Sequence, residues 1–150
     1  MSVIKLIIIA LTVLAITYLA GLSFLSRQHR IKAEGDRQLS PCPGKPNCVS
    51  SLSVGEGHAV SAFSLINEDP VFSWDKLMVS IQKSGGEMLV NDGRYAHAIF
   101  TSRLFRFKDD LEVRLEEKQI DVRSASRAGT SDLGQNRKRV EQIRLHYSVE

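Results

Sequence analysis

The chain has 150 residues, of which 43% are hydrophobic and 25% are charged, and its formal net charge is +3. This composition is typical of a globular protein and excludes a disordered or low-complexity chain. The basic excess belongs to the N-terminal part, because the residues from Leu39 onward carry 15 basic and 15 acidic side chains. The charge therefore does not favour nucleic-acid binding, and we expect no nucleic-acid partner.

The chain begins with an apolar segment, since the residues from Leu6 to Leu25 carry no charge. A helix of about twenty residues spans about 30 Å, the hydrocarbon thickness of a bilayer. We therefore predict one N-terminal transmembrane helix within residues 1–26, either an uncleaved anchor or a cleaved signal, with the membrane as its partner. The polar residues 27–40 are predicted to be a linker, and residues 41–150 a single domain.

Both cysteines, Cys42 and Cys48, lie in a short segment rich in proline. Such a segment can bring the two sulfurs within disulfide reach. Free thiols and a metal or redox role are the alternatives, but a metal would need two further ligands and His58 is the only nearby candidate. A structural disulfide is our preferred interpretation, and it indicates an oxidising compartment.

The orientation of the helix in the membrane has two competing indications. More basic residues follow the apolar segment than precede it, which by the positive-inside rule leaves the domain in the cytoplasm. The cysteine segment favours export instead. We expect a single-pass protein of the inner membrane with a periplasmic domain, and the cytoplasmic orientation is the alternative.

The domain is expected to start with a strand and a helix. Residues 59–66 form a short apolar run that predicts a strand, and Asp69-Pro70 ends it. Ser73 is a candidate N-cap for a helix with one apolar face, which Ser84-Gly85-Gly86 ends. The apolar positions that define this face are Trp74, Leu77, Met78 and Ile81.

Strands linked by hairpins are expected next, over residues 87–90, 95–102, 105–115 and 120–126. The run 105–115 has one apolar and one charged face. Asp132 can then cap a last helix, in a capping box with Gln135. Val140, Ile143 and Tyr147 would line the inner side of that helix, although residues 143–149 also alternate and leave a terminal strand as the alternative.

The element order β-α-β-β-β-β-α predicts an α+β fold. Strands linked by hairpins form an antiparallel sheet, and two helices on its one apolar face complete a two-layer sandwich. The topology resembles the TATA-binding-protein-like and helix-grip folds. That likeness is architectural and implies no function.

Asp109 interrupts the apolar face of the run 105–115, because it shares that face with Phe107 and Leu111. A buried carboxylate is costly unless it is paired. A strand-end bulge that turns Asp109 to solvent is one interpretation. A structural ion pair with an arginine of the following segment, Arg127, is the second, and a catalytic acid is the third.

Opposite charges gather in two neighbouring segments: residues 109–121 carry six acidic and two basic side chains, and residues 122–144 carry six basic and two acidic ones. Mutual neutralisation across the hairpin is one explanation. The other is an anion site where the loop meets the last helix, because helix N-termini and arginines bind carboxylate and phosphate. Asp132 argues against this site, since it would occupy the helix start. The predicted ligand-binding residues are Ser124, Ser126, Arg127, Ser131, Asn136, Arg137 and Arg139.

Catalytic chemistry has little support in the sequence. The histidines are scattered, His97 reads as a core or surface residue, and no serine lies in a nucleophile elbow. No grouping has metal-ligand spacing, and no glycine-rich phosphate loop is present. We expect no metal, no cofactor and no catalytic residue, and an enzyme is the less favoured class.

Several segments, in chain order, match a known family: Pro41-Cys42-Pro43 with residues 46–51, Phe105-Arg106-Phe107 with Asp109-Asp110, residues 123–127, and residues 131–134 with 136–141. With these segments the chain resembles the bacterial and plastid family called domain of unknown function 1499, over about residues 40–145. The resemblance implies a small secreted, lipoprotein-like or membrane-anchored domain. It implies no established reaction.

Three hypotheses for function follow. The leading one is a non-catalytic, membrane-anchored envelope protein that binds an anionic small molecule, lipid headgroup or envelope polymer at the junction rich in arginine and serine. The second is an envelope protein–protein interaction module. The third is a hydrolase-like enzyme that uses Asp109.

Overall fold

The computed structural model describes residues 2–28 and 37–148, so most of the predicted linker lies outside the described residues. The described residues form three α-helices, six strands and one 3-10 helix. In order these are α1 (Val3–Gln28), β1 (Cys48–Ser50), β2 (Phe63–Ser64), η1 (Ile66–Glu68), α2 (Pro70–Lys83), β3 (Glu87–Asn91), β4 (Tyr95–Thr101), β5 (Lys108–Leu115), β6 (Gln119–Ser126) and α3 (Gln135–Ser148).

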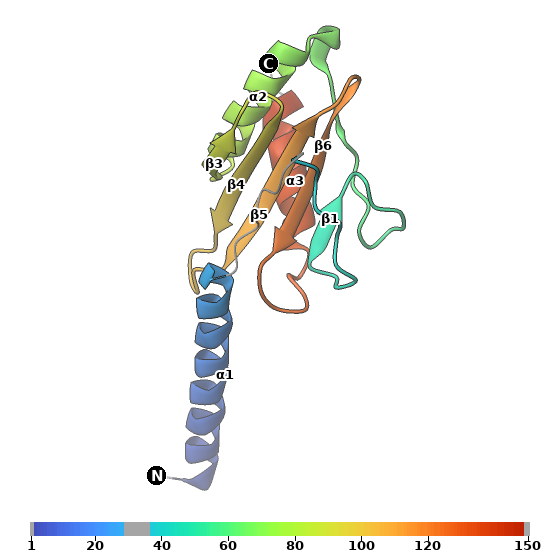
Figure 1. Cartoon of the computed structure of the whole chain (residues 1–150). Helices are drawn as coiled ribbons and strands as arrows, with labels where there is room; N and C mark the ends of the chain where they lie inside the picture. Colours follow the sequence, from blue (N-terminus) through green and yellow to red (C-terminus); the bar gives the residue numbers. More distant parts are fainter. Residues whose placement is uncertain (1, 29–36, 149–150) are drawn as a thin grey trace.

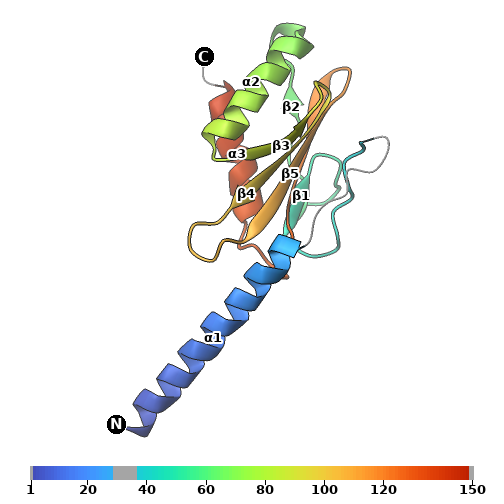
Figure 2. The same ribbon diagram turned by 60° about the vertical axis from the view of Figure 1, so that its left-hand side comes forward.

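The strands form one antiparallel sheet in the order β1-β6-β5-β4-β3, and β2 also pairs with β6. Helices α2 and α3 lie together on one face of this sheet (Figures 1 and 2). The predicted α+β architecture, with four consecutive hairpin-linked strands, is therefore confirmed.

The hydrophobic core lies between the sheet and the two helices. Residues directly opposite each other in an antiparallel sheet point to the same side, so the pairs Ala98–Leu111 and Val113–Val122 both face the helices. The four apolar residues predicted for the first helix of the domain are all buried in this core. Val140, Ile143 and Tyr147 of α3 join them, as predicted.

The start of α2 differs from the prediction. Asp69, rather than Ser73, is the N-cap, and its carboxylate accepts a hydrogen bond from the Phe72 amide at 3.0 Å. Pro70 occupies the first helical turn, where its missing N–H costs nothing. Ser73 is buried one turn later and donates to the Asp69 carbonyl at 2.6 Å.

Two strands are shorter than the sequence patterns predict. Only Phe63–Ser64 of the run 59–66 pairs with β6. Strand β5 begins at Lys108 because residues 102–107 form a loop, which the Ser102 amide closes by donating to the Phe107 carbonyl at 2.9 Å. No sequence pattern predicted β1, whose three residues pair with β6 at the sheet edge.

Helix α3 continues to Ser148, so the alternative of a terminal strand is wrong. The Tyr147 hydroxyl donates to the Ser64 carbonyl at 2.8 Å and fixes the end of the helix on β2. Asp132 does cap the helix start, since its carboxylate accepts from the amides of Gly134 at 3.0 Å and Asn136 at 2.7 Å. Gln135 is the first helical residue, so it does not stand at the third position of a capping box.

Helix α1 extends away from the domain (Figure 1). It is long and apolar enough to cross a membrane, with a mean hydropathy of 2.5 and none of its apolar window buried. Only its last turns contact the domain, where Ser23 and Ser26 are buried. This geometry is consistent with a membrane anchor.

Candidate functional site

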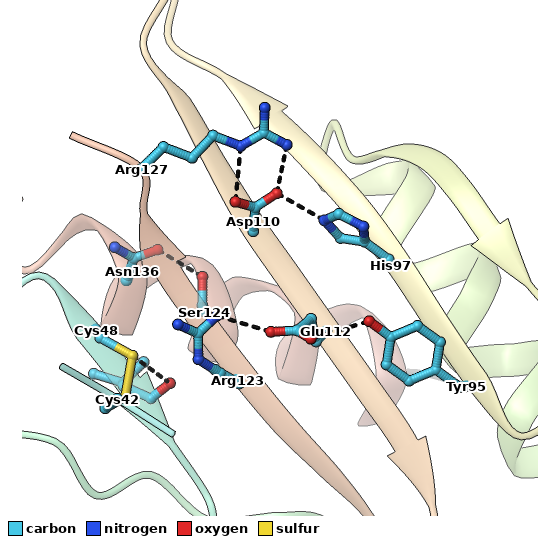
Figure 3. A network of polar contacts seen from close by, with 11 residues as sticks. Cys42, Cys48, Tyr95, His97, Asp110, Glu112, Arg123, Ser124, Arg127 and Asn136 are labelled. Atoms are coloured by element: carbon cyan, nitrogen blue, oxygen red, sulfur yellow. Dashed lines mark hydrogen bonds and ion pairs between the residues drawn. A yellow bond between two sulfur atoms is a disulfide. The ribbon is translucent and has the colours of Figure 1, made fainter. Parts of the chain in front are cut away.

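The face of the sheet opposite the helices carries a buried group of ionisable side chains. Strands β4 and β5 each place two of them there, β6 places one, and Arg127 follows directly after β6, because these residues alternate with the core residues along each strand. The side chains are at most 8% exposed. We call this group the open-face network; its members are Tyr95, His97, Asp110, Glu112, Arg123 and Arg127 (Figure 3).

Asp110 is the hub of one half of the open-face network. Arg127 binds both of its carboxylate oxygens, through Nε at 2.8 Å and Nη2 at 2.6 Å, and His97 Nε2 lies 2.7 Å from Oδ1. Burial alone would raise the pKa of the Asp110 carboxyl, but the contacts with His97 and Arg127 outweigh burial and lower it. Asp110 is therefore an ionised carboxylate that offsets the buried guanidinium of Arg127.

Glu112 is the hub of the other half. It accepts a hydrogen bond from the Tyr95 hydroxyl at 3.0 Å and one from Arg123 Nη1 at 2.8 Å. Burial, and then the negative charge of Glu112, raise the pKa of the Tyr95 hydroxyl. Arg123 Nε is buried and has no hydrogen-bond partner among the described residues.

The segment 37–42 crosses this face of the sheet. Arg37 forms an ion pair with Asp92 in the β3–β4 turn, and Cys42 forms a disulfide with Cys48 on β1. Because Cys48 pairs with Ala125 and Ala125 with Asp110, the disulfide lies on the same side as the open-face network. We call residues 37–42 the strap.

A polar pocket lies at one end of the strap, beside the β3–β4 and β5–β6 turns. Its volume is about 390 Å³. We call it the arginine pocket; it is lined by Arg37, Asp92, Arg94, Tyr95, Arg114, Leu115 and Glu116. Tyr95 is shared with the open-face network, so the pocket is the exposed end of that network.

The cations of the arginine pocket outnumber its carboxylates. Arg37 pairs with Asp92, and Arg114 Nε binds Glu116 at 2.9 Å. Arg114 Nη1 is buried without a hydrogen-bond partner in the part of the chain that the structure describes. The guanidinium of Arg94 also has none there, and it is exposed. These donors suit a carboxylate or phosphate.

A second polar group lies on the other side of β5 and β6, beneath the start of α3. Asn136 connects it: its Oδ1 accepts from Ser124 at 2.6 Å and from Arg139 at 2.5 Å, and its Nδ2 donates to Ser126 at 3.0 Å. Arg139 also binds Asp109 at 2.6 Å. We call these five residues the helix-side network.

The predicted pair of Asp109 with Arg127 is wrong, because the two residues point to opposite faces of the sheet. Asp109 pairs with Ser126 on the helix side, whereas Arg127 follows Ser126 and therefore faces the other way. Asp109 binds Arg139, and Arg127 binds Asp110. The carboxylate of Asp109 thus takes the structural role among the alternatives that the sequence left open.

The seven predicted ligand-binding residues do not share one surface. Ser124, Ser126, Asn136 and Arg139 come together in the helix-side network and satisfy one another there. Arg127 belongs to the open-face network. Arg137 donates to the carbonyls of Ala59 at 2.8 Å and Glu56 at 3.0 Å. Ser131 is exposed and accepts from the Leu133 amide at 3.3 Å.

Sequence reasoning missed Tyr95, Asp110, Glu112 and Arg123. Their signal was present, because the run 105–115 places acidic residues on its charged face, and Arg123 of the next strand pairs with one of them on that face. The pairing of Glu112 with Arg123 follows directly from the hairpin register. What the pattern did not indicate is that this charged face is covered.

The cysteine prediction is confirmed, since Cys42 and Cys48 form a disulfide. Among the described residues, no group of three or more His, Cys, Asp or Glu side chains has a geometry that could hold a metal ion.

A family model described as "Protein of unknown function (DUF1499)" matches residues 38–146, which includes the six described strands, α2 and all but the last two residues of α3. No curated protein matches the sequence.

Proposed function

Since the chain belongs to the DUF1499 family, whose function is unknown, we propose from its geometry that it is a membrane-anchored, non-catalytic binding protein for an anionic molecule. In this proposal α1 is a single-pass anchor in the inner membrane. The domain is exported, and the ligand binds in the arginine pocket.

The observation that carries the proposal is the unpartnered Nη1 of Arg114. This donor is shielded from solvent, so a ligand oxygen reaches it only when the guanidinium turns toward the pocket. That contact would remove the cost of about 1–3 kcal/mol that an unpartnered buried donor carries. Arg94 stands at the same pocket with no partner of its own among the described residues. Three arginines face two carboxylates, so the pocket keeps one unmatched positive charge.

The junction favoured by the sequence is a weaker candidate. Four of its seven residues already satisfy one another in the helix-side network, so a ligand would have to break those contacts. Asp132 occupies the N-terminus of α3 with both carboxylate oxygens. An anion there would meet a negative charge at the position where the helix otherwise attracts one.

The position of the pocket narrows the ligand class. Helix α1 contacts the β4–β5 loop at one end of the sheet, whereas the arginine pocket lies at the turns of the other end. A headgroup of the anchoring membrane is therefore out of reach. The remaining ligands of the proposed class are a soluble anion or an anionic envelope polymer.

The disulfide supports the exported orientation. Disulfides persist in oxidising compartments and are rare in the cytosol. Cys42–Cys48 fastens the strap to β1 over the open-face network, so the fold uses the bond structurally. This argument opposes the one from the basic residues that flank α1, and we give it the greater weight.

The test is a titration of the full chain in detergent micelles with inorganic phosphate and with citrate, followed by NMR of the amide signals. We expect saturable shifts at residues 92–95 and 114–116, which Arg94→Gln and Arg114→Gln each weaken. Arg137→Gln is the matched control, because Arg137 belongs to the junction predicted from sequence. Loss of the shifts in Arg137→Gln alone would assign the site to that junction and refute the pocket.

A further inference from the structure

We infer that the β4–β5 loop, residues 102–107, lies in the interfacial layer of the bilayer that α1 crosses. The inference rests on the proposed anchoring of α1 and adds a second membrane contact to it. The partner is the lipid surface of the same membrane.

The loop is held against the last turns of α1. The hydroxyl of Ser23 donates to the carbonyl of Phe105, and the amide of Lys108 donates to the hydroxyl of Ser26 at 3.2 Å. Ser26 also donates to the Ser23 carbonyl at 2.7 Å. Because Ser23 and Ser26 are the buried residues of α1, this contact fixes the depth of the loop relative to the helix.

That depth lies at the end of the membrane span. The uncharged run of α1 ends at Leu25, and Ser23 lies two residues before it, or about 3 Å along the helix axis. Arg27, the first charged residue after the run, lies about 6 Å beyond Ser23 along the axis. If the run fills the hydrocarbon layer, the Phe105 carbonyl is at its boundary with the headgroups.

The composition of the loop suits this boundary. Leu104 is 82% exposed, although it is a large apolar side chain, and the half-buried rings of Phe105 and Phe107 lie 6.1 Å apart. Arg103 precedes the two phenylalanines and Arg106 lies between them in the chain, and both arginines are exposed. Apolar and aromatic side chains favour the outer acyl region, and the long arginine side chains reach the lipid phosphates.

Two contacts with the membrane would restrict the tilt of the domain. With α1 and the loop both at the bilayer, the end of the sheet that bears the arginine pocket points away from the membrane (Figure 1). A flexible tether alone would leave that direction undefined.

The test places the full chain, with labelled Ile, Leu and Val methyl groups, in nanodiscs of phosphatidylcholine and phosphatidylglycerol. Some lipids carry a nitroxide near the headgroup end of the acyl chain. We expect the methyl signals of Leu104 to lose most of their intensity. Val71 is the matched control, because it is 70% exposed at the start of α2, near the other end of the sheet, and its signals should persist.

The methyl signals of Ile8, inside the span, separate the two proposals. Loss at Ile8 and Leu104 with persistence at Val71 supports the inference. Loss at Ile8 with an unchanged Leu104, or equal loss at Leu104 and Val71, overturns it while the anchor stands. An unchanged Ile8 overturns the anchor and the inference together, and the phosphate titration tests the pocket independently.

Discussion

Replacing Asp110 by Asn tests whether the open-face network stabilises the fold. The substitution keeps the size of the side chain but removes the charge that balances Arg127. Asp110 takes two hydrogen bonds from Arg127, at 2.6 and 2.8 Å, and contacts His97 at 2.7 Å, and its side chain is 2% exposed. The guanidinium of Arg127 would be left buried without a counter-charge.

The expected loss of stability in Asp110→Asn follows from the burial of both Asp110 and Arg127. Removing one partner of a buried ion pair costs about 3–5 kcal/mol, because the remaining charge is desolvated and unpaired. For a domain of this size, that loss lowers the melting temperature by more than about 10 °C. The assay is thermal unfolding of the full chain in detergent, followed by near-ultraviolet circular dichroism.

Glu141→Gln is the control, because the pair of Glu141 with Arg144 is exposed at 52% and 26%. Exposed pairs contribute about 0–1 kcal/mol, so this variant should unfold within a few degrees of the wild type. The double variant Asp110→Asn, Arg127→Leu should recover part of the loss, since no unpaired guanidinium remains. If Asp110→Asn melts with the control, the buried pair does not stabilise the fold as argued.

Three further predictions concern pH, packing and the disulfide. The pKa of the Asp110 carboxyl is lowered in the folded state, so the carboxylate stabilises the fold at neutral pH. This contribution is lost as the pH falls below 3.8, the ordinary pKa of the group, and through the folded-state pKa. In urea titrations over that range the difference in free energy of unfolding between wild type and Asp110→Asn should shrink, and a constant difference would contradict the assignment. Gly86→Ala should lower the free energy of unfolding by about 1–3 kcal/mol, because a Cβ there would lie 2.6 Å from Ile81 Cγ2 and 2.9 Å from Phe100 Cζ. Gly57→Ala should be neutral, since a Cβ at Gly57 would have no atom within 4 Å. Equal urea midpoints for the two variants would refute the packing argument. The double variant Cys42→Ser, Cys48→Ser should lose about 2 kcal/mol of stability, which is the loop-closure value for a sequence separation of 6. Amide hydrogen exchange at Glu112 and Arg123 should accelerate in this variant, because the strap loosens. Unchanged exchange would show that the strap does not protect the open-face network.

The fold was predictable where one face of an element is apolar. The period of the core residues in α2 and the alternation along β5 each identify an element, because burial of one face determines the pattern. Strand β1 carries no such pattern in its three residues, and it forms because the disulfide and the β6 edge hold it.

The candidate site was less predictable, because sequence patterns do not show which charged face is covered. The alternation along β5 correctly placed Asp110 and Glu112 opposite the core. Their burial depends on segments that lie on them from elsewhere in the chain, such as the strap, which begins 73 residues before Asp110. Likewise, the partner of Asp109 depends on how α3 packs, and only the register of β6 excludes Arg127.

The claim on which the rest depends is that α1 anchors the domain on the oxidising side of a membrane. Its most direct test uses two fusions to Glu150 of the full chain, expressed in a bacterium with two membranes. One fusion carries a phosphatase that is active only after export, and the other carries a fluorescent protein that matures only in the cytoplasm. We predict phosphatase activity without fluorescence in the membrane fraction. Fluorescence without phosphatase activity would place the domain in the cytoplasm and contradict the account.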